Sequence, residues 1–295
     1  MTAFKHTVAL AALLAGVAGT ASAQVAYTGA VNLGYADIDG DTDATNLTTD
    51  FDANIAFNSG FELDLGLSMN RVDVDEVPFD LHMDRASIAP KYNFSNGLTA
   101  GLYVEKSELS IGEDVDMLSY GLNGEFAIAG ATIGAFYGET DIDGLDDDTT
   151  DWGLNATYAM GETLAVAGGF ARTEVDAFGE DLDLDLWKLG AAYDFGNNIT
   201  VFAGANWGDF EGMDVDTWGL GASYDASAYT PIPVIASIEY AETDADMLGD
   251  VDVWRFGVTL PFGNKGTASA PLNSVAGSAF NQSPNTISDA LVTAF

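Results

Sequence analysis

A seven-residue pattern of alternating polarity recurs along the chain and constrains its fold more than any other feature. The clearest copy is Trp152–Tyr158, W-G-L-N-A-T-Y, in which every second residue is aromatic, apolar or small and the residues between are Gly, Asn and Thr. Period two is typical of a strand with one apolar face, whereas helical repeats need apolar residues three and four apart. The repeat, about 34 residues long, therefore predicts strand hairpins. Further copies begin at Phe51, Tyr120, Trp187, Trp218 and Trp254.

The first 23 residues are typical of a secretory signal peptide. Lys5 precedes the apolar run Val8–Val17, and the small residues Ala21–Ala23 provide a cleavage site. The run is too short for a membrane anchor, and no apolar segment of about 18 residues or more follows it. We therefore expect residues 1–23 to be removed on export and no transmembrane helix in the mature chain.

Charge and composition exclude several classes of protein. The chain has 46 acidic and nine basic residues, a net charge of -37, and no cysteine. Such a charge opposes nucleic-acid binding, which needs a basic surface, and the absence of cysteine rules out disulfides. Hydrophobic residues make up 47% and aromatic residues 11%, so most of the chain is expected to be ordered.

We count fourteen alternating segments between residues 24 and 262. Each has about 9–14 residues, the length that a tilted strand needs to cross a bilayer. Short turns rich in Gly and Asn alternate with longer, strongly acidic connections, such as the one between the predicted strands 98–107 and 116–128. The pattern predicts an all-β fold, a closed antiparallel transmembrane β-barrel with an up-and-down meander.

Aromatic residues begin and end the repeat on its apolar face, as in the two interfacial girdles of a membrane barrel. The tryptophans follow the acidic connections and the tyrosines precede the short turns. The predicted girdle consists of Trp152, Tyr158, Trp187, Tyr193, Trp218, Tyr224 and Trp254.

With these features the chain resembles the Gram-negative porin superfamily. The resemblance rests on the signal peptide, the alternating strands over residues 24–262 and the segment Trp254–Phe262, which is similar to a closing porin strand. It implies export through the periplasm to the outer membrane, contact with lipid and lipopolysaccharide, and a possible homotrimer. Porins of this superfamily commonly have sixteen strands, fold one long loop inward and end on the phenylalanine of the last strand. Here no acidic connection is clearly long enough to fold inward.

The C-terminal residues 263–295 depart from the porin pattern. They are rich in Ser, Ala, Asn, Gly and Thr and nearly uncharged. They could be a flexible segment, or Ser274–Phe280 and Ile287–Phe295 could form a last strand pair and raise the count to sixteen. A tail that occludes the lumen is a further alternative.

Strand parity places many charged residues on the inner face, because Lys or Arg facing lipid at mid-membrane costs about 2–4 kcal/mol. The other inner positions are mostly Gly, Ala, Thr and Asn, which are too small to fill a barrel of this size. We therefore expect a water-filled lumen. Its charges either impose a transverse field and favour cations or brace the wall by pairing. The predicted pore-lining charges are Asp52, Glu62, Asp64, Arg85, Lys91, Glu105, Glu125, Lys188, Glu239 and Arg255.

Other chemistry is weakly represented. The spacing of Asp37, Asp39, Asp41 and Asp43 suits Ca²⁺ or Mg²⁺ ligands, but the glycine and glutamate of an EF-hand loop are missing. We expect loose binding of these ions at most and no cofactor. Beyond the signal peptide, His82 is the single histidine, and no Gly-x-Ser-x-Gly turn accompanies it, so no enzyme is predicted.

The sequence thus predicts a porin for passive diffusion of small hydrophilic solutes and ions, with a preference for cations. The alternative is a structural or adhesive outer-membrane barrel whose lumen is occluded and whose acidic extracellular loops bind cations.

Overall fold

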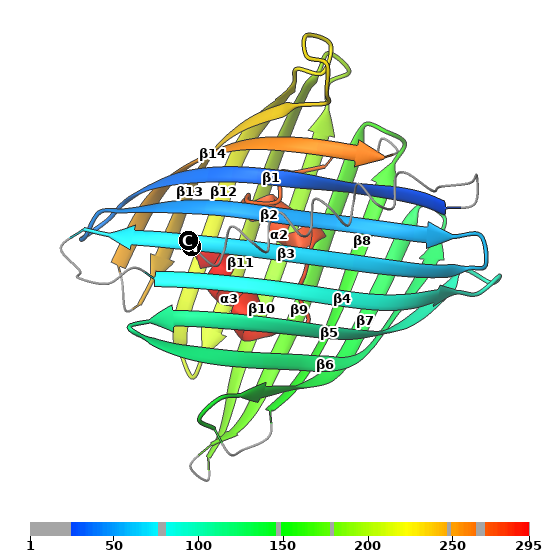
Figure 1. The fold of residues 1–295 in the computed structure, drawn as a ribbon. Helices are drawn as coiled ribbons and strands as arrows, with labels where there is room; N and C mark the ends of the chain where they lie inside the picture. The colour runs from blue at the N-terminus through cyan, green and yellow to red at the C-terminus, as the bar shows by residue number, and fades with distance from the viewer. Residues whose placement is uncertain are drawn as a thin grey trace.

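Fourteen antiparallel strands form one closed barrel in the computed structural model, which describes residues 25–75, 81–145, 149–177, 180–246, 249–263 and 269–294 (Figure 1). Each strand pairs with its neighbours in sequence, and β1 closes on β14. The predicted signal peptide lies outside the described residues. The strands are β1 (Val25–Asp39), β2 (Ala44–Phe57), β3 (Phe61–Val74), β4 (Leu81–Asn93), β5 (Leu98–Ile111), β6 (Glu113–Ile128), β7 (Ala131–Ile142), β8 (Thr149–Met160), β9 (Leu164–Ala177), β10 (Glu180–Asp194), β11 (Ile199–Phe210), β12 (Met213–Asp225), β13 (Ile235–Ala245) and β14 (Gly249–Gly263).

The predicted fourteen-strand meander is confirmed, and the alternative of sixteen strands is wrong. The segments proposed for a last strand pair, Ser274–Phe280 and Ile287–Phe295, instead contain helices α2 (Val275–Phe280) and α3 (Thr286–Ala294) within the described residues. The sheet is already closed by the β1–β14 ladder. A closed ladder leaves no edge to which further strands could add.

The two ends of the barrel both have tight connections. At one end the predicted short turns are present, and Ala129 and Gly130 have φ values of 51° and 85°, which suits a two-residue hairpin turn. At the other end, Gly112 alone separates β5 from β6. The prediction of long acidic loops is therefore wrong for this hairpin. Alternating residues continue through the acidic segments, so the strands keep pairing beyond the tryptophans.

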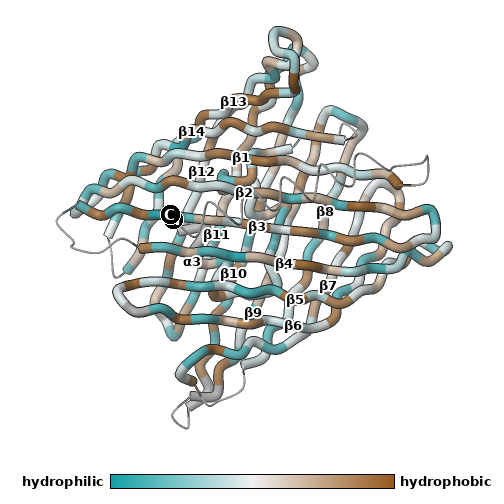
Figure 2. The backbone as a smooth tube through the Cα atoms, in the orientation of Figure 1, coloured by the Kyte–Doolittle hydropathy of each residue, from teal (hydrophilic) through white to brown (hydrophobic). Residues whose placement is uncertain are grey.

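The outer surface between the two ends carries large apolar side chains, and brown apolar residues alternate with paler and teal residues along the strands (Figure 2). Such an exposed apolar surface is far larger than a water-soluble monomer carries. It is the surface expected of a barrel in lipid. Its exposed residues include Leu33, Leu102, Leu122, Leu154, Leu189, Leu220 and Val258.

The inner face of the strands changes character at the acidic end. There the outward residues are acidic, as at Asp37 and Asp39, while the inward residues Ile38 and Val253 are apolar and buried. We call these acidic-end portions the strand extensions. Their inward residues form a buried cluster, the apolar collar, made of Ala36, Ile38, Ala44, Val72, Ala241, Val253 and, from the tail, Val275.

Candidate functional site

The lumen of the barrel is crossed by the C-terminal tail, residues 269–294. β14 ends at the barrel end with the short turns, and α2 and α3 lie inside the ring of strands (red in Figure 1). Helix α2 lies mainly against β9, β10, β11 and β12. The tail therefore occupies part of the lumen beside these four strands.

Local hydrogen bonds cap the N-termini of the two short helices of the tail. The Ser274 hydroxyl accepts a bond of 2.9 Å from the Gly277 backbone N–H and caps α2. The Asn285 side chain accepts a bond of 2.9 Å from the Ser288 N–H at the start of α3. Ser and Asn are preferred caps because their short side chains satisfy otherwise unpaired N–H groups.

One group of predicted pore-lining residues lies near the short-turn end of the lumen. It contains Asp52, Glu62, Asp64, Lys91 and Glu125, whose side chains remain partly or fully exposed to the interior. The Lys91 ammonium lies 2.7 Å from Asp64 Oδ2 and also pairs with Glu125. These residues line an open, water-accessible part of the lumen.

The other group lies beneath the tail. Lys188 is 1% exposed, Glu105 and Glu239 are 2% exposed, and Arg255 is 6% exposed. A polar pore wall should be wet, so this burial was not expected from the strand pattern. Arg255 Nη1 lies 3.2 Å from Glu239 Oε2 across the β13–β14 ladder.

The tail supplies most partners of this second group. Asp289 lies 2.6 Å from Lys188 Nζ and 3.6 Å from Arg85 Nη1. The Val275 backbone N–H donates to both carboxylate oxygens of Glu239, at 3.1 and 3.3 Å. Counting Arg85, whose side chain is 18% exposed, the five charges of this group are thus paired directly with the tail or with a residue that touches it.

Glu105 is the anchor of the segment before α3. Its carboxylate accepts bonds from the Ser283 hydroxyl at 2.8 and 2.9 Å and from the Ser288 hydroxyl at 3.1 Å. Asn285 Nδ2 donates to the Ser119 hydroxyl at 2.9 Å. A buried carboxylate is tolerated when its oxygens accept several hydrogen bonds.

Glycines in the barrel wall make room for α2. A Cβ added at Gly190 would lie 2.6 Å from the Ala276 carbonyl oxygen, and one added at Gly219 would lie 2.9 Å from Val275 Cγ2. A Cβ at Gly204 would collide with the Ala276 backbone. The prediction that these small inner residues leave only water-filled space is therefore wrong for the part of the wall beneath α2.

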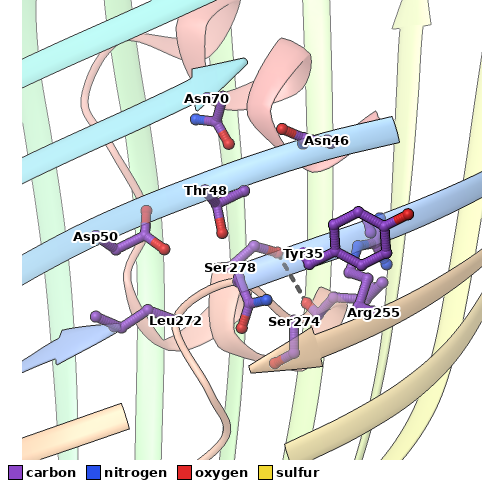
Figure 3. A pocket seen from close by; sticks show the side chains of 12 residues that line it. Tyr35, Asn46, Thr48, Asp50, Asn70, Arg255, Leu272, Ser274 and Ser278 are labelled. Atoms are coloured by element: carbon purple, nitrogen blue, oxygen red, sulfur yellow. Dashed lines mark hydrogen bonds between the residues drawn. The ribbon is translucent and has the colours of Figure 1, made fainter. Parts of the chain in front are cut away.

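Space remains between the tail and the wall formed by β1, β2 and β3. Figure 3 shows this pocket, with Asn46, Thr48, Asp50 and Asn70 on the wall side and Ser274 and Ser278 on the tail side. Asp50 accepts bonds from Ser68 at 2.8 Å and from Asn32 at 3.2 Å. The lining is mixed, since the charged residues Asp50 and Arg255 and several polar side chains lie beside the apolar Leu272 and Val275.

Sequence reasoning missed several inward residues. Asp151 is not among the predicted pore-lining charges, but it is fully buried on the inner face and accepts bonds from the Thr140 and Thr173 hydroxyls. The outward placement of Trp152 could have revealed this, because adjacent strand residues face opposite sides. No sequence signal pointed to Asp289.

The predicted aromatic residues lie on the outer surface. Trp187, Trp218 and Trp254 are exposed towards the acidic end, and Tyr158, Tyr193 and Tyr224 towards the short turns. Trp152 packs against Phe170 with ring centroids 5.2 Å apart. Two belts of amphipathic rings mark the boundaries of a bilayer.

The weak metal candidates do not form a site. Asp37 and Asp39 point outward from β1, while Asp41 and Asp43 lie in or beside the connection to β2. Over the described ranges, no group of three or more His, Cys, Asp and Glu residues is arranged to hold a metal ion. Nor does any helix in the described part of the chain have the length and apolarity to cross a membrane.

Comparisons with known proteins agree with this architecture. The family model described as Gram-negative porin matches residues 60–178 and 176–288. No curated protein sequence matches the chain. The anion-selective porin from Comamonas acidovorans has a similar fold, with a TM-score of 0.50, 12% identity and coverage of 81% of this chain and 99% of that one.

Two further solved structures are more distant. Pseudomonas aeruginosa OccK3 has a TM-score of 0.46, with 13% identity and coverage of 82% of this chain and 96% of that one. A structure described only as porin has a TM-score of 0.46, with 17% identity and coverage of 81% and 100%. The family match and the barrel point to a channel protein of the outer membrane. The chain belongs to the Gram-negative porin family.

Proposed function

We propose that this porin lets small hydrophilic solutes and ions diffuse passively across the outer membrane and favours cations. The observation that carries the proposal is a closed barrel with an apolar outer surface and a polar, acid-rich inner face. The mature chain would reach the membrane through the periplasm after loss of residues 1–23. Contact with lipopolysaccharide and assembly into a homotrimer belong to the same proposal.

The cation preference rests on a surplus of acids along the inner face. In the described part of the wall, the inward basic residues Arg85, Lys91, Lys188 and Arg255 each lie within 4 Å of an acid. Asp50, Asp52, Glu62 and Asp151 remain as additional inward acids. Rings of fixed negative charge concentrate cations in a pore. The Comamonas porin is described as anion-selective, and its 12% identity carries no argument about selectivity here.

Single-channel recording of the refolded full chain tests the proposal. In a KCl gradient the reversal potential should show cation preference, and this preference should weaken as the pH falls towards about 4, where carboxylates become protonated. Asp52→Asn should weaken it at neutral pH. Asp141→Asn, on the outer face, is the matched control. Anion preference at neutral pH would contradict the proposal.

The second candidate is a structural or adhesive barrel, and the tail inside the lumen favours it. In that case the acids on the outside of the strand extensions would meet Ca²⁺ or Mg²⁺ and, through them, lipopolysaccharide phosphates. Chelation of divalent ions should then lower the Tm of the barrel in lipopolysaccharide-containing vesicles. A well-folded full chain without conductance would support this candidate, and an unchanged Tm would count against its cation-binding part.

A further inference from the structure

We propose that residues 269–294 are a built-in, displaceable plug of the channel and that Asp289 is its lock. This inference rests on the proposed channel function, since a plug has no effect where no pore exists. The tail follows β14 in the chain after residues 264–268, and among the described residues it adds no strand to the barrel. It can therefore leave the lumen without breaking the β1–β14 closure.

The lock is an ion pair between the wall and the plug. The Lys188 side chain is 0% exposed and that of Asp289 is 3% exposed, with 2.6 Å between their charged atoms. Among the described residues, Asp289 is the acid that pairs with Lys188 within 4 Å. A buried cation that loses its partner is strongly destabilised unless water reaches it. Loss of the Asp289 charge should therefore drive the plug out of the lumen.

Further polar plug contacts are hydrogen bonds to wall acids on opposite sides of the barrel, beside the apolar contacts of Val275 and Ala276 with the wall. Glu239 on β13 accepts a hydrogen bond from the Val275 N–H, and Glu105 on β5 accepts hydrogen bonds from two serine hydroxyls. Asp151 on β8 receives the Thr286 backbone N–H. These bonds replace bonds to water, and each contributes modestly to net stability. The plug thus spans the lumen, and water can replace these hydrogen bonds when the plug leaves.

The shape of the wall fits α2 in particular. Gly190, Gly204 and Gly219 bring three neighbouring strands into contact with its backbone or with Val275. Val275 also joins the apolar collar at the acidic end. The plug is therefore held against the apolar collar on one side and against the wall of β10, β11 and β12 on the other.

Truncation after residue 268 tests the plug. The truncated barrel should show a single-channel conductance several-fold larger than that of the full chain. Equal conductance in the two proteins would overturn the plug proposal while leaving the porin proposal intact. Absence of conductance in both proteins, each folded, would overturn the porin proposal.

Point variants test the lock in the full-length chain. Asp289→Asn keeps the side-chain size and removes the charge. We expect long-lived open states at the truncated level, with the open-to-closed ratio raised roughly 100-fold, because a buried charge loses its partner. Ser278→Ala is the control, since it removes a bond of 3.3 Å to Asn206 on the wall and one of 2.8 Å to the Val275 carbonyl within the tail but no charge, and should change the ratio little. Equal effects of the two variants would refute Asp289 as the lock.

Thiol labelling reports the position of the tail without a current measurement. The chain has no cysteine, so Ala192→Cys introduces a single thiol on the inner wall, in the buried cluster with Ala276. A charged, water-soluble thiol reagent should label it much faster in the truncated barrel and in the Asp289→Asn background. Thr99→Cys, near the short-turn end, should react equally in all three. Fast labelling of Ala192→Cys in the otherwise unchanged chain would overturn the plug.

Discussion

The belt between the aromatic girdles and the strand extensions follow the same alternation with opposite polarity. In the belt, Leu189 points outward and is 54% exposed, while Lys188 points inward. In the extensions, Asp39 points outward while Val253 points inward and is 0% exposed. The difference teaches that a period of two identifies the residues that share a face. Which face is apolar depends on whether lipid or water lies outside.

The largest expected effect comes from placing a charge on the inner face of the extensions. Val253→Asp buries a carboxylate without a partner and should lower the free energy of unfolding by about 3–5 kcal/mol. Thr157→Asp, on the inner face of the belt, should cost far less because water reaches that position. Denaturant unfolding in lipid vesicles, followed by tryptophan fluorescence, measures both. Equal losses would mean that the apolar collar is hydrated.

The outer face gives the reverse comparison. Leu189→Arg places a charge in lipid and should cost about 2–4 kcal/mol near the bilayer midplane. Asp39→Arg, outward from the extension, should change stability by less than about 0.5 kcal/mol. The same unfolding assay applies. A large loss for Asp39→Arg would place lipid around the extension and break the comparison.

The boundary between the two regions is set by rings such as Trp187, whose centroid lies 4.4 Å from that of Phe170. Trp187→Ala should lower the free energy of unfolding by the contribution of the apolar area that it removes and by a further amount of about 0.5–1.5 kcal/mol, the range for an aromatic pair. Trp187→Phe should restore part of this loss because the ring contact is kept. If Phe is no better than Ala, the Phe170 contact does not stabilise the boundary.

The smallest effect is expected for ion pairs on the outside of the extensions. Arg172 binds Asp185 through two bonds of 2.5 Å and lies 3.3 Å from Asp183. Because this network lies on the outer surface and is partly exposed to solvent, Arg172→Met should cost only about 0.2–1 kcal/mol. The loss should shrink further in about 1 M salt, which screens exposed charges. A salt-independent loss would show that the network is shielded from water.

The sequence alone predicted a closed meander of about fourteen strands, the faces of most strand residues and two aromatic belts, and left the alternative of sixteen strands for the structure to exclude. All three follow from local alternation and from tight turns such as Ala129-Gly130, which need no knowledge of distant contacts. Alternation also placed Lys188 and Glu239 inward. It could not reveal that they are buried, because their surroundings include a segment far along the chain.

Only the tertiary structure decided the route of the tail and the content of the lumen. Helix α2 has six residues, too few to be stable alone in water, and the segment has no strong periodicity. It is held by wall groups such as Glu105, which lies 178 positions before its partner Ser283. From their sequence alone, these residues could be a flexible tail. Inside the barrel they are ordered, because the closed wall supplies their hydrogen-bond partners and counterions.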